Sequence, residues 1–260
     1  MSLTKEWLLP VTRTLVKLKA EGPVYALGDQ ITYFTHDYAR RKLQGAGLLR
    51  NPSAPLIPCH ENPKMVSFRT VLALIGLTDF YDIDLNGQAA LNWDLSKPIP
   101  AELKGRAGVV IDIGTCEHIF NLTQVFANIV ELLGTGGLVL HLAPLSWYNH
   151  GFVNFNPIWF KEFYQCNQFQ LLEHGLIVAP FAYSMLSFFE RLGLEEHFLE
   201  SRIAPLSFFL NDESRMLARI ANHFGMSGRV IILFAARKTV DNQGVVFPCQ
   251  EIYRQSILKP

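Results

Sequence analysis

The stretch GVVIDIGTCEHIFNLTQVFANIVELLGTGGLVLHLAP, residues 108–144, decides the fold of this chain. A buried-strand run, Val109–Ile113, breaks at the polar residues 114–118. A helical segment follows and ends at the glycine-rich residues 134–137, after which a second apolar run, Leu138–Ala143, stops at Pro144. This order of strand, polar loop, helix, glycine-rich turn and strand is typical of a parallel α/β sheet with ligand chemistry at its strand ends.

The flanking sequence predicts further elements of the same sheet. Apolar residues at helical spacing predict an N-terminal helix within residues 1–20. Residues 179–227, roughly 50 positions, are too many for an ordinary connection, so we predict a helical insert that caps the sheet edge. The other predicted elements are strands at 24–27, 80–84, 89–93, 169–178 and 229–237 and helices at 67–77 and 157–168.

Composition and charge narrow the class of protein. The chain has 260 residues, of which 49% are hydrophobic, so it can bury a substantial core. Its 23 basic and 23 acidic side chains give no net charge, which argues against the clustered basic face of a nucleic-acid binder. The four cysteines form no CxxC pair, so we predict neither a zinc site nor a disulfide framework.

The sequence also bears on location. Its start lacks the apolar run of a signal peptide. The most apolar later stretch, residues 175–189, is shorter than the roughly 18 residues that a membrane-spanning helix needs. We expect a cytoplasmic protein with a small-molecule substrate and neither a nucleic-acid nor a membrane partner, and we leave a homodimer open.

In their order, the residues at the strand ends resemble those of class I methyltransferases that use S-adenosylmethionine (SAM). The resemblance covers roughly residues 24–169 and the final strand. It implies the Rossmann-like methyltransferase fold, a single SAM-binding domain over residues 1–260 with a mostly parallel sheet and an antiparallel last strand. Gly28, Asp29 and Gln30 stand where the family has a glycine-rich loop beside the methionine part of SAM, although only one glycine of that pattern is present.

The resemblance also implies how SAM's nucleoside would be held. Asp84, with Asp82 as a weaker candidate, stands where a family carboxylate accepts the ribose hydroxyls. It lies 84 − 28 = 56 positions after Gly28, so we predict an insertion that contains the proline-rich residues 47–63. The alternative is that Asp84 caps a turn. Asp94 would accept the adenine amino group, and the backbone N–H of Leu95 would meet a ring nitrogen.

The loops after the fourth and fifth strands would face the transfer centre. Gly114 and Thr115 would bind the methionine end of SAM, and Glu117-His118 resembles a Glu-His pair that opens the next helix, where a carboxylate is also favoured by the helix dipole. Residues 149–157 are similar to a bacterial methyltransferase-like subgroup linked to small-molecule and glycan pathways. Candidate catalytic residues are His118, Tyr148, His150 and Asn154, and aromatic candidates for contact with the sulfonium are Phe120, Tyr148, Phe152 and Phe155.

Three functions remain open at this point. The first is methyl transfer from SAM to a small natural-product or glycan-type acceptor, with His118 or His150 as the base where one is needed. The second is cyclisation of SAM, in which its α-amine attacks Cγ and gives azetidine-2-carboxylate and methylthioadenosine. The third is a non-catalytic binding subunit. A nucleotide-dependent oxidoreductase is disfavoured because no Gly-x-Gly-x-x-Gly follows a strand.

Overall fold

An eight-stranded sheet in the order β3-β2-β1-β4-β5-β8-β6-β7 runs through the protein. The structure, a computed structural model, describes residues 2–147, 150–179, 208–211, 229–241 and 244–250. Neighbouring strands from β3 to β5 are parallel, whereas β8 is antiparallel to both β5 and β6. The order β3-β2-β1-β4-β5 is that of a doubly wound Rossmann-like sheet, so the predicted fold is confirmed. The strands are β1 Val24–Leu27, β2 Phe80–Asp84, β3 Leu91–Asn92, β4 Ala107–Ile113, β5 Leu133–Ser146, β6 Phe169–Ala179, β7 Phe208–Asn211 and β8 Arg229–Lys238.

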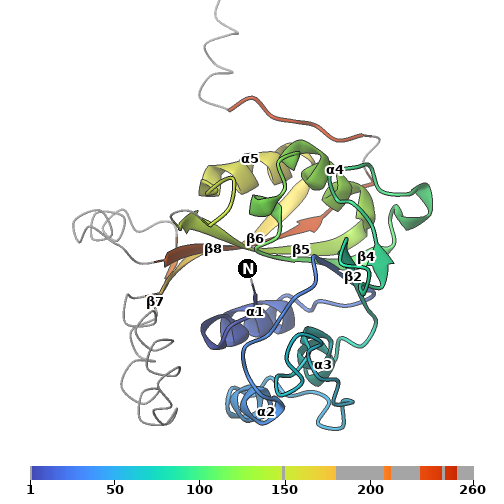
Figure 1. Cartoon of the computed structure of the whole chain (residues 1–260). Coiled ribbons are helices and arrows are strands. Elements are labelled where there is room, and N and C mark those ends of the chain that lie inside the picture. Colours follow the sequence, from blue (N-terminus) through green and yellow to red (C-terminus); the bar gives the residue numbers. More distant parts are fainter. Residues whose placement is uncertain (1, 148–149, 180–207, 212–228, 242–243, 251–260) are drawn as a thin grey trace, which may run out of the picture.

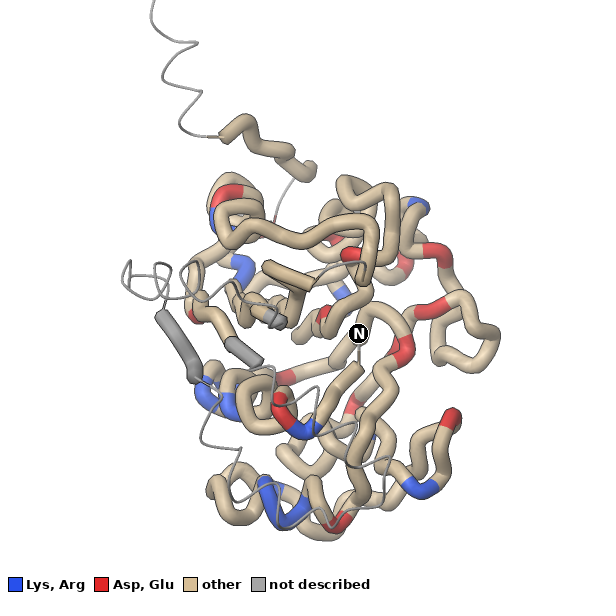
Figure 2. Tube along the Cα trace, turned by 60° about the vertical axis from the view of Figure 1, so that its left-hand side comes forward, with Lys and Arg blue, Asp and Glu red and all other residues tan. Residues whose placement is uncertain are grey.

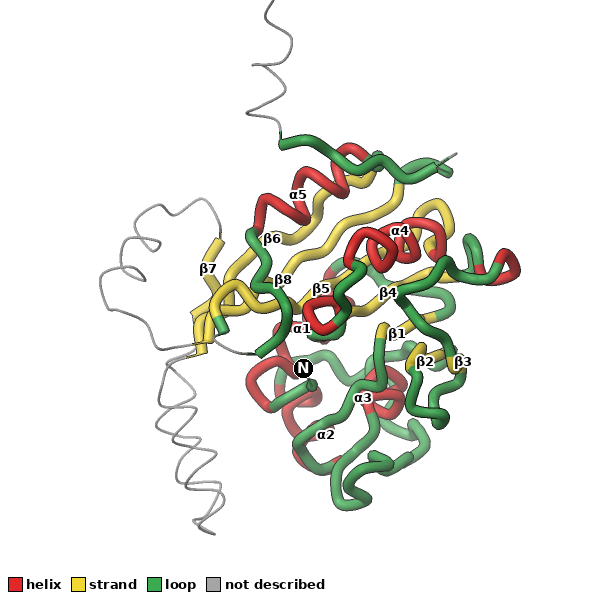
Figure 3. The backbone as a smooth tube through the Cα atoms, turned by 45° about the horizontal axis from the view of Figure 1, so that its top comes forward, coloured by secondary structure: helices red, strands yellow, loops and turns green. Residues whose placement is uncertain are grey.

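Helices cover both faces of the sheet and make three layers. Figure 1 shows α1, α2 and α3 on one face and α4 and α5 on the other. Figure 3 shows the short strands β2 and β3 at one edge and β6 and β7 at the opposite edge. The helices are α1 Lys5–Lys17, α2 His36–Gly45, α3 Phe68–Leu74, α4 Leu122–Leu132 and α5 Pro157–Cys166, with 3-10 turns η1 Ala101–Leu103 and η2 Cys116–His118. The helix α2 had no counterpart among the predicted elements.

The central strands are apolar on both faces because helices cover both. In β4, Val109 and Ile111 pack into the core under α1–α3, whereas Val110 packs into the core under α4 and α5. This double burial produces the near-continuous apolar runs that predicted a parallel sheet. Asp112 interrupts the run of β4 and is itself fully buried.

The strand β5 is longer than predicted at both ends. It begins at Leu133 and includes the glycine-rich residues 134–137, which were predicted to form a turn, and it continues past Pro144 to Ser146. Pro144 is accommodated because the pairing of β5 with β4 ends at Leu142, and Pro144 pairs with Ile231 of β8. A proline, which lacks an N–H, fits such a one-sided position in a sheet.

The predicted helical insert at residues 179–227 lies mostly outside the described residues. Its described part is wrong as a helix, because Ala179 belongs to β6 and Phe208–Asn211 form β7, which pairs with β6. Aromatic residues favour the pleated surface of a strand, and the outer edge of β6 offers the partner. The predicted N-terminal helix corresponds to α1. Within the described ranges, no helix combines the length and apolarity that crossing a membrane requires.

Charged residues of both signs are spread over the molecule. Figure 2 shows lysine and arginine interspersed with aspartate and glutamate along the described trace. This distribution agrees with the zero net charge of the chain.

Candidate functional site

The predicted site residues follow the carboxyl ends of neighbouring parallel strands. Because such strands end at one edge of the sheet, the loops after β1, β2, β4 and β5 meet there. The predicted cofactor residues are distributed over these loops and the one after β3: Gly28, Asp29 and Gln30 after β1, Asp84 at the end of β2, Asp94 and Leu95 after β3, and Gly114, Thr115 and Phe120 after β4.

Asp84 is hydrogen-bonded directly to the loop after β1. Its Oδ2 accepts the backbone N–H of Asp29 at 2.8 Å. Its Oδ1 accepts the N–H of Leu85 at 2.6 Å and that of Asn86 at 3.2 Å. A carboxylate has about four lone-pair positions, so about one remains for a further donor. Asp84 therefore caps the turn after β2 and retains room for one ligand hydroxyl rather than two.

The insertion between β1 and β2 folds back onto Asp29. His60 Nδ1 lies 3.2 Å from Asp29 Oδ2, and Asn86 Nδ2 donates to the same oxygen at 2.9 Å. Burial raises the pKa of Asp29, while the nearby His60 lowers it in part. The segment between Gly28 and Asp84 therefore contributes His60 to this edge of the site.

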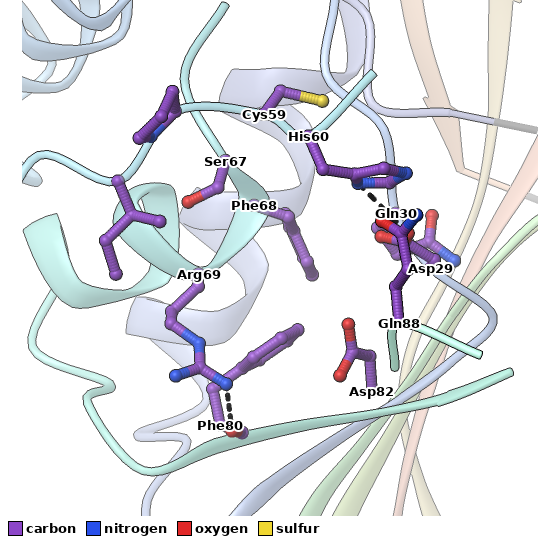
Figure 4. A pocket seen from close by; sticks show the side chains of 12 residues that line it. Asp29, Gln30, Cys59, His60, Ser67, Phe68, Arg69, Phe80, Asp82 and Gln88 are labelled. Carbon is purple, nitrogen blue, oxygen red and sulfur yellow. Dashed lines mark hydrogen bonds and ion pairs between the residues drawn. The ribbon is translucent and has the colours of Figure 1, made fainter. Parts of the chain in front are cut away.

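A cavity of about 190 Å³ lies beside this edge, between α3, β2 and the proline-rich loop. Figure 4 shows Asp82, His60 and Arg69 around it. Arg69 donates to the carbonyl of Phe80 at 3.1 Å, and Asp82 accepts the N–H of Ala90 at 2.7 Å. Arg69 and Asp82 therefore already have protein partners, and they stabilise the wall of the cavity.

Gly28, Gln30 and Thr115 form one packed unit between the ends of β1 and β4. Gly28 has a φ of 75°, and a Cβ there would lie 2.5 Å from Thr115 Oγ1. Thr115 Oγ1 donates to the carbonyl of Leu27 at 2.6 Å, and Gln30 Nε2 donates to the same carbonyl at 2.7 Å. Within the described residues, the buried Oε1 of Gln30 accepts no hydrogen bond.

The loop after β3 is anchored to α4 by a residue that the sequence did not single out. Asn128 is buried and donates to the carbonyls of Leu95 at 2.9 Å and Lys97 at 2.8 Å. Asp94 Oδ1 accepts the N–H of Ser96 at 2.9 Å, and its hydrogen bonds with Ser96 lower the pKa of Asp94. Asp94 and Leu95 thus occupy a fixed loop, in which Leu95 is largely buried.

A buried network beneath the loop after β4 is the second feature that the sequence did not single out. Asp112 Oδ2 lies 2.7 Å from His141 Nδ1, and His141 Nε2 lies 2.6 Å from Tyr164 Oη. Asp112 Oδ1 accepts the backbone N–H of Thr115 at 3.0 Å and that of Cys116 at 3.3 Å. The available signal was one ionisable residue inside each of two apolar strands, because such a residue needs a buried partner.

Glu117 is fully buried and faces two histidines. In the described part of the chain, neither carboxylate oxygen has a hydrogen-bond partner. His150 Nε2 lies 3.4 Å from Glu117 Oε1, and His118 Nε2 lies 4.0 Å from it. Burial and the charge of Asp112 raise the pKa of Glu117 to about 8, and burial lowers the pKa of His118.

The predicted placement of Glu117 at the start of the next helix is wrong. Glu117 and His118 belong to the separate 3-10 turn η2, and α4 begins only at Leu122. The carboxylate therefore points into the protein instead of lying at the N-terminus of α4, where the helix dipole would act on it.

The remaining candidates lie on the loops after β4 and β5. Phe120 and Phe152 are 86% and 67% exposed, and their ring centroids lie 5.7 Å apart. Asn154 Oδ1 accepts the N–H of Trp147 at 3.0 Å, so Asn154 stabilises the loop after β5 to which it belongs. Phe155 is buried in the core under α4 and α5. The candidate Tyr148 lies outside the described residues.

Comparison with known proteins gives similarities of structure. The sequence matches no family model and no curated protein. A proposed methyltransferase from Bacillus halodurans is 13% identical, with a TM-score of 0.47 over 88% of this chain and 99% of that one. Phosphoethanolamine N-methyltransferase 2 from Haemonchus contortus, in complex with SAM, is 11% identical, with a TM-score of 0.43 over 90% and 56%. The 1,6-didemethyltoxoflavin-N1-methyltransferase from Burkholderia thailandensis is 11% identical, with a TM-score of 0.43 over 90% and 78%.

Proposed function

We propose that this protein is a SAM-dependent enzyme that transfers a methyl group to a small-molecule acceptor. The observation that carries the proposal is the 2.8 Å hydrogen bond from the N–H of Asp29 to Asp84. The resemblance assigns these two residues to the methionine and ribose parts of SAM. The bond joins segments 55 positions apart at the edge where ligands bind in Rossmann-like sheets.

The chain's own residues provide groups for each part of SAM. Asp84 accepts one ribose hydroxyl at its remaining lone pair, and the loop of Gly28, Asp29 and Gln30 borders the methionine end. The loop of Asp94 and Leu95 borders the adenine. SAM supplies an activated methyl group, whose transfer from sulfur to the acceptor leaves S-adenosylhomocysteine.

The aromatic pair supports the binding of a cation at the transfer centre. Phe120 and Phe152 are exposed, and their rings meet edge to face at the loops after β4 and β5. Aromatic faces attract a cation electrostatically without requiring a counter-charge. Three polar side chains, those of Glu117, His118 and His150, lie close together beside Phe120 and Phe152. An acceptor that loses a proton on methylation would lie near them.

Replacing Asp84 by alanine should weaken SAM binding at least about tenfold. The reason is that a hydrogen bond to a charged group contributes about 1.5–3 kcal/mol, and the loop after β1 also loses its anchor. Isothermal titration calorimetry with SAM measures the affinity, and far-UV circular dichroism checks folding. Asp82→Ala is the matched control, because Asp82 lies on the same strand and lines the neighbouring cavity. Unchanged affinity in Asp84→Ala would refute the ribose assignment, and a loss in Asp82→Ala alone would transfer it to Asp82.

Incubation of the enzyme with SAM alone, and then with a panel of small acceptors, tests the reaction. We expect S-adenosylhomocysteine to form only when an acceptor is present, as followed by mass spectrometry. Release of methylthioadenosine and azetidine-2-carboxylate without an acceptor would replace methyl transfer by cyclisation. Tight SAM binding with neither product would indicate a binding subunit, and absence of SAM binding would overturn the proposal altogether.

A further inference from the structure

Three potential metal ligands converge at the loops after β4 and β5. They are Glu117 and His118 of η2 and His150, which follows β5. One ligand atom of each residue lies within 4.8 Å of the others. The nearest pair, Glu117 Oε1 and His150 Nε2, is 3.4 Å apart. Ligands at about 2.1 Å from a tetrahedral zinc ion lie about 3.4 Å apart, so this pair already has the required separation.

The carboxylate is the group that most requires a partner. Glu117 is completely buried, and neither of its oxygens has a hydrogen-bond partner among the described residues. Buried carboxylates are normally hydrogen-bonded, paired with a cation or bound to a metal. The two imidazoles beside Glu117 are the side chains that most often complete a transition-metal site.

The loop that carries His150 is built closely against Glu117. A Cβ on Gly151 would lie 2.7 Å from the carbonyl oxygen of Glu117, so only glycine allows this approach. The N–H of Phe152 donates to the same carbonyl at 2.8 Å. The His150 ring stacks on Trp147 at 3.7 Å with an interplanar angle of 7°. These contacts fix the imidazole beside the carboxylate before any ligand binds.

One side of the group is open. The side chain of His118 is 42% exposed and that of His150 is 17% exposed, whereas both Glu117 oxygens and His150 Nε2 are themselves buried, so an ion would enter past His118. His118 Nε2 lies 4.0 Å from Glu117 Oε1 and needs to approach by a fraction of an ångström, which its exposure permits. Catalytic metal sites characteristically keep such an open position.

A second group of similar composition serves as an internal comparison. Asp112, Cys116 and His141 also lie within 4.8 Å of one another, but all three are buried. Asp112 is bonded to His141 and to two backbone N–H groups, and His141 reaches Tyr164. Because the polar atoms of Asp112 and His141 already have hydrogen-bond partners within the protein, we interpret this second group as structural.

We propose that Glu117, His118 and His150 bind one divalent transition-metal ion of the zinc type through two imidazoles and one carboxylate. Two histidines and one carboxylate form a recurrent open ligand set for such ions. The cysteine spacing predicted no metal site, and this site uses no cysteine. Binding of the ion does not depend on SAM. Its role rests on the proposed function: in the open position, the ion would orient an acceptor oxygen beside the aromatic pair.

The test is metal binding by the full chain after treatment with a chelator. Zn²⁺ is titrated by calorimetry, and Co²⁺ is followed by its visible absorption, which reports nitrogen ligation and coordination number. We expect one ion per chain. Each of three substitutions should weaken ion binding by at least about tenfold: Glu117→Gln, His118→Ala and His150→Ala. The reason is that even residues that only support the metal ligands change metal affinity by about tenfold to hundredfold. His118→Ala changes a partly exposed side chain, so it remains informative if Glu117→Gln unfolds.

Two control variants separate this site from the alternatives. Cys116→Ser removes a ligand from the buried comparison group, and His36→Ala removes a histidine outside both groups. Both should leave the ion affinity unchanged. Absence of binding, binding that survives all three ligand substitutions, or loss of binding in Cys116→Ser alone would overturn the proposal. SAM titration of the metal-free protein keeps the two proposals distinct, because failure to bind one ligand leaves binding of the other measurable.

Discussion

Replacing Asp112 by alanine is expected to lower the free energy of unfolding by about 3–5 kcal/mol, the cost of breaking a buried pair by removing one partner. The substitution leaves His141 buried without its 2.7 Å partner. It also removes the acceptor of the backbone N–H groups of Thr115 and Cys116. Urea denaturation followed by circular dichroism measures the change.

Two matched variants identify the origin of that loss. Asp112→Asn retains Oδ1 for the two backbone N–H groups but replaces the oxygen that faces His141, so we expect a smaller loss. Asp37→Ala removes a carboxylate that is 89% exposed, and it should cost less than about 1 kcal/mol. An equal effect of Asp112→Ala and Asp37→Ala would show that the network does not stabilise the fold.

The same carboxylate predicts a loss of stability in acid. Burial of Asp112 acts to raise its pKa, but the hydrogen bond and charge of His141, together with the hydrogen bonds from Thr115 and Cys116, hold the pKa below the ordinary 3.8. Since the folded pKa lies below the unfolded one, the stabilisation is present above pH 3.8 and disappears as the pH falls through the folded pKa. Asp112→Asn should lack this part of the pH dependence. Parallel pH profiles of the two proteins would contradict the assignment.

Replacing Gly28 by alanine is expected to disrupt the junction between β1 and β4. A non-glycine residue at a φ of 75° costs about 1–3 kcal/mol in backbone strain. The new Cβ would also lie 2.5 Å from Thr115 Oγ1 and force Thr115 away from the carbonyl of Leu27. Loss of that hydrogen bond adds about 1 kcal/mol. We expect lower stability in urea and, under the proposed function, weaker SAM binding.

Gly105→Ala is the matched control for this substitution. Gly105 has a φ of 72°, and a Cβ there would meet nothing within 4 Å. It should therefore show the backbone strain alone, with SAM affinity unchanged. Adding Thr115→Ala to Gly28→Ala should recover part of the stability, because it removes the crowded oxygen. Equal destabilisation by Gly28→Ala and Gly105→Ala, without such recovery, would mean that the contact with Thr115 is unimportant.

The sheet could be predicted because its signals are local. Strand β2 has the predicted bounds Phe80–Asp84, and β1 likewise has the predicted bounds Val24–Leu27. Strands buried on both faces are continuously apolar, so a few neighbouring residues identify each one. The errors occurred where a partner overrides local preference. Pro144 remains in β5 because β8 is the only described strand that pairs with it, and Phe208–Asn211 form a strand because β6 offers an edge.

The sequence by itself determined the order of apolar runs and polar breaks, and with it the sheet and the edge where the candidate residues gather. Only the tertiary structure decided which side chains meet. It paired Asp112 with His141, which are opposite each other in the register of β4 and β5, and it turned Glu117 inward toward His150. The physical reason is the distance along the chain over which each signal acts. Apolar periodicity can be recognised within a few neighbouring residues. A buried polar contact depends instead on strand register and on the path of loops, because Asp112 and His141 are 29 positions apart and Glu117 and His150 are 33 positions apart.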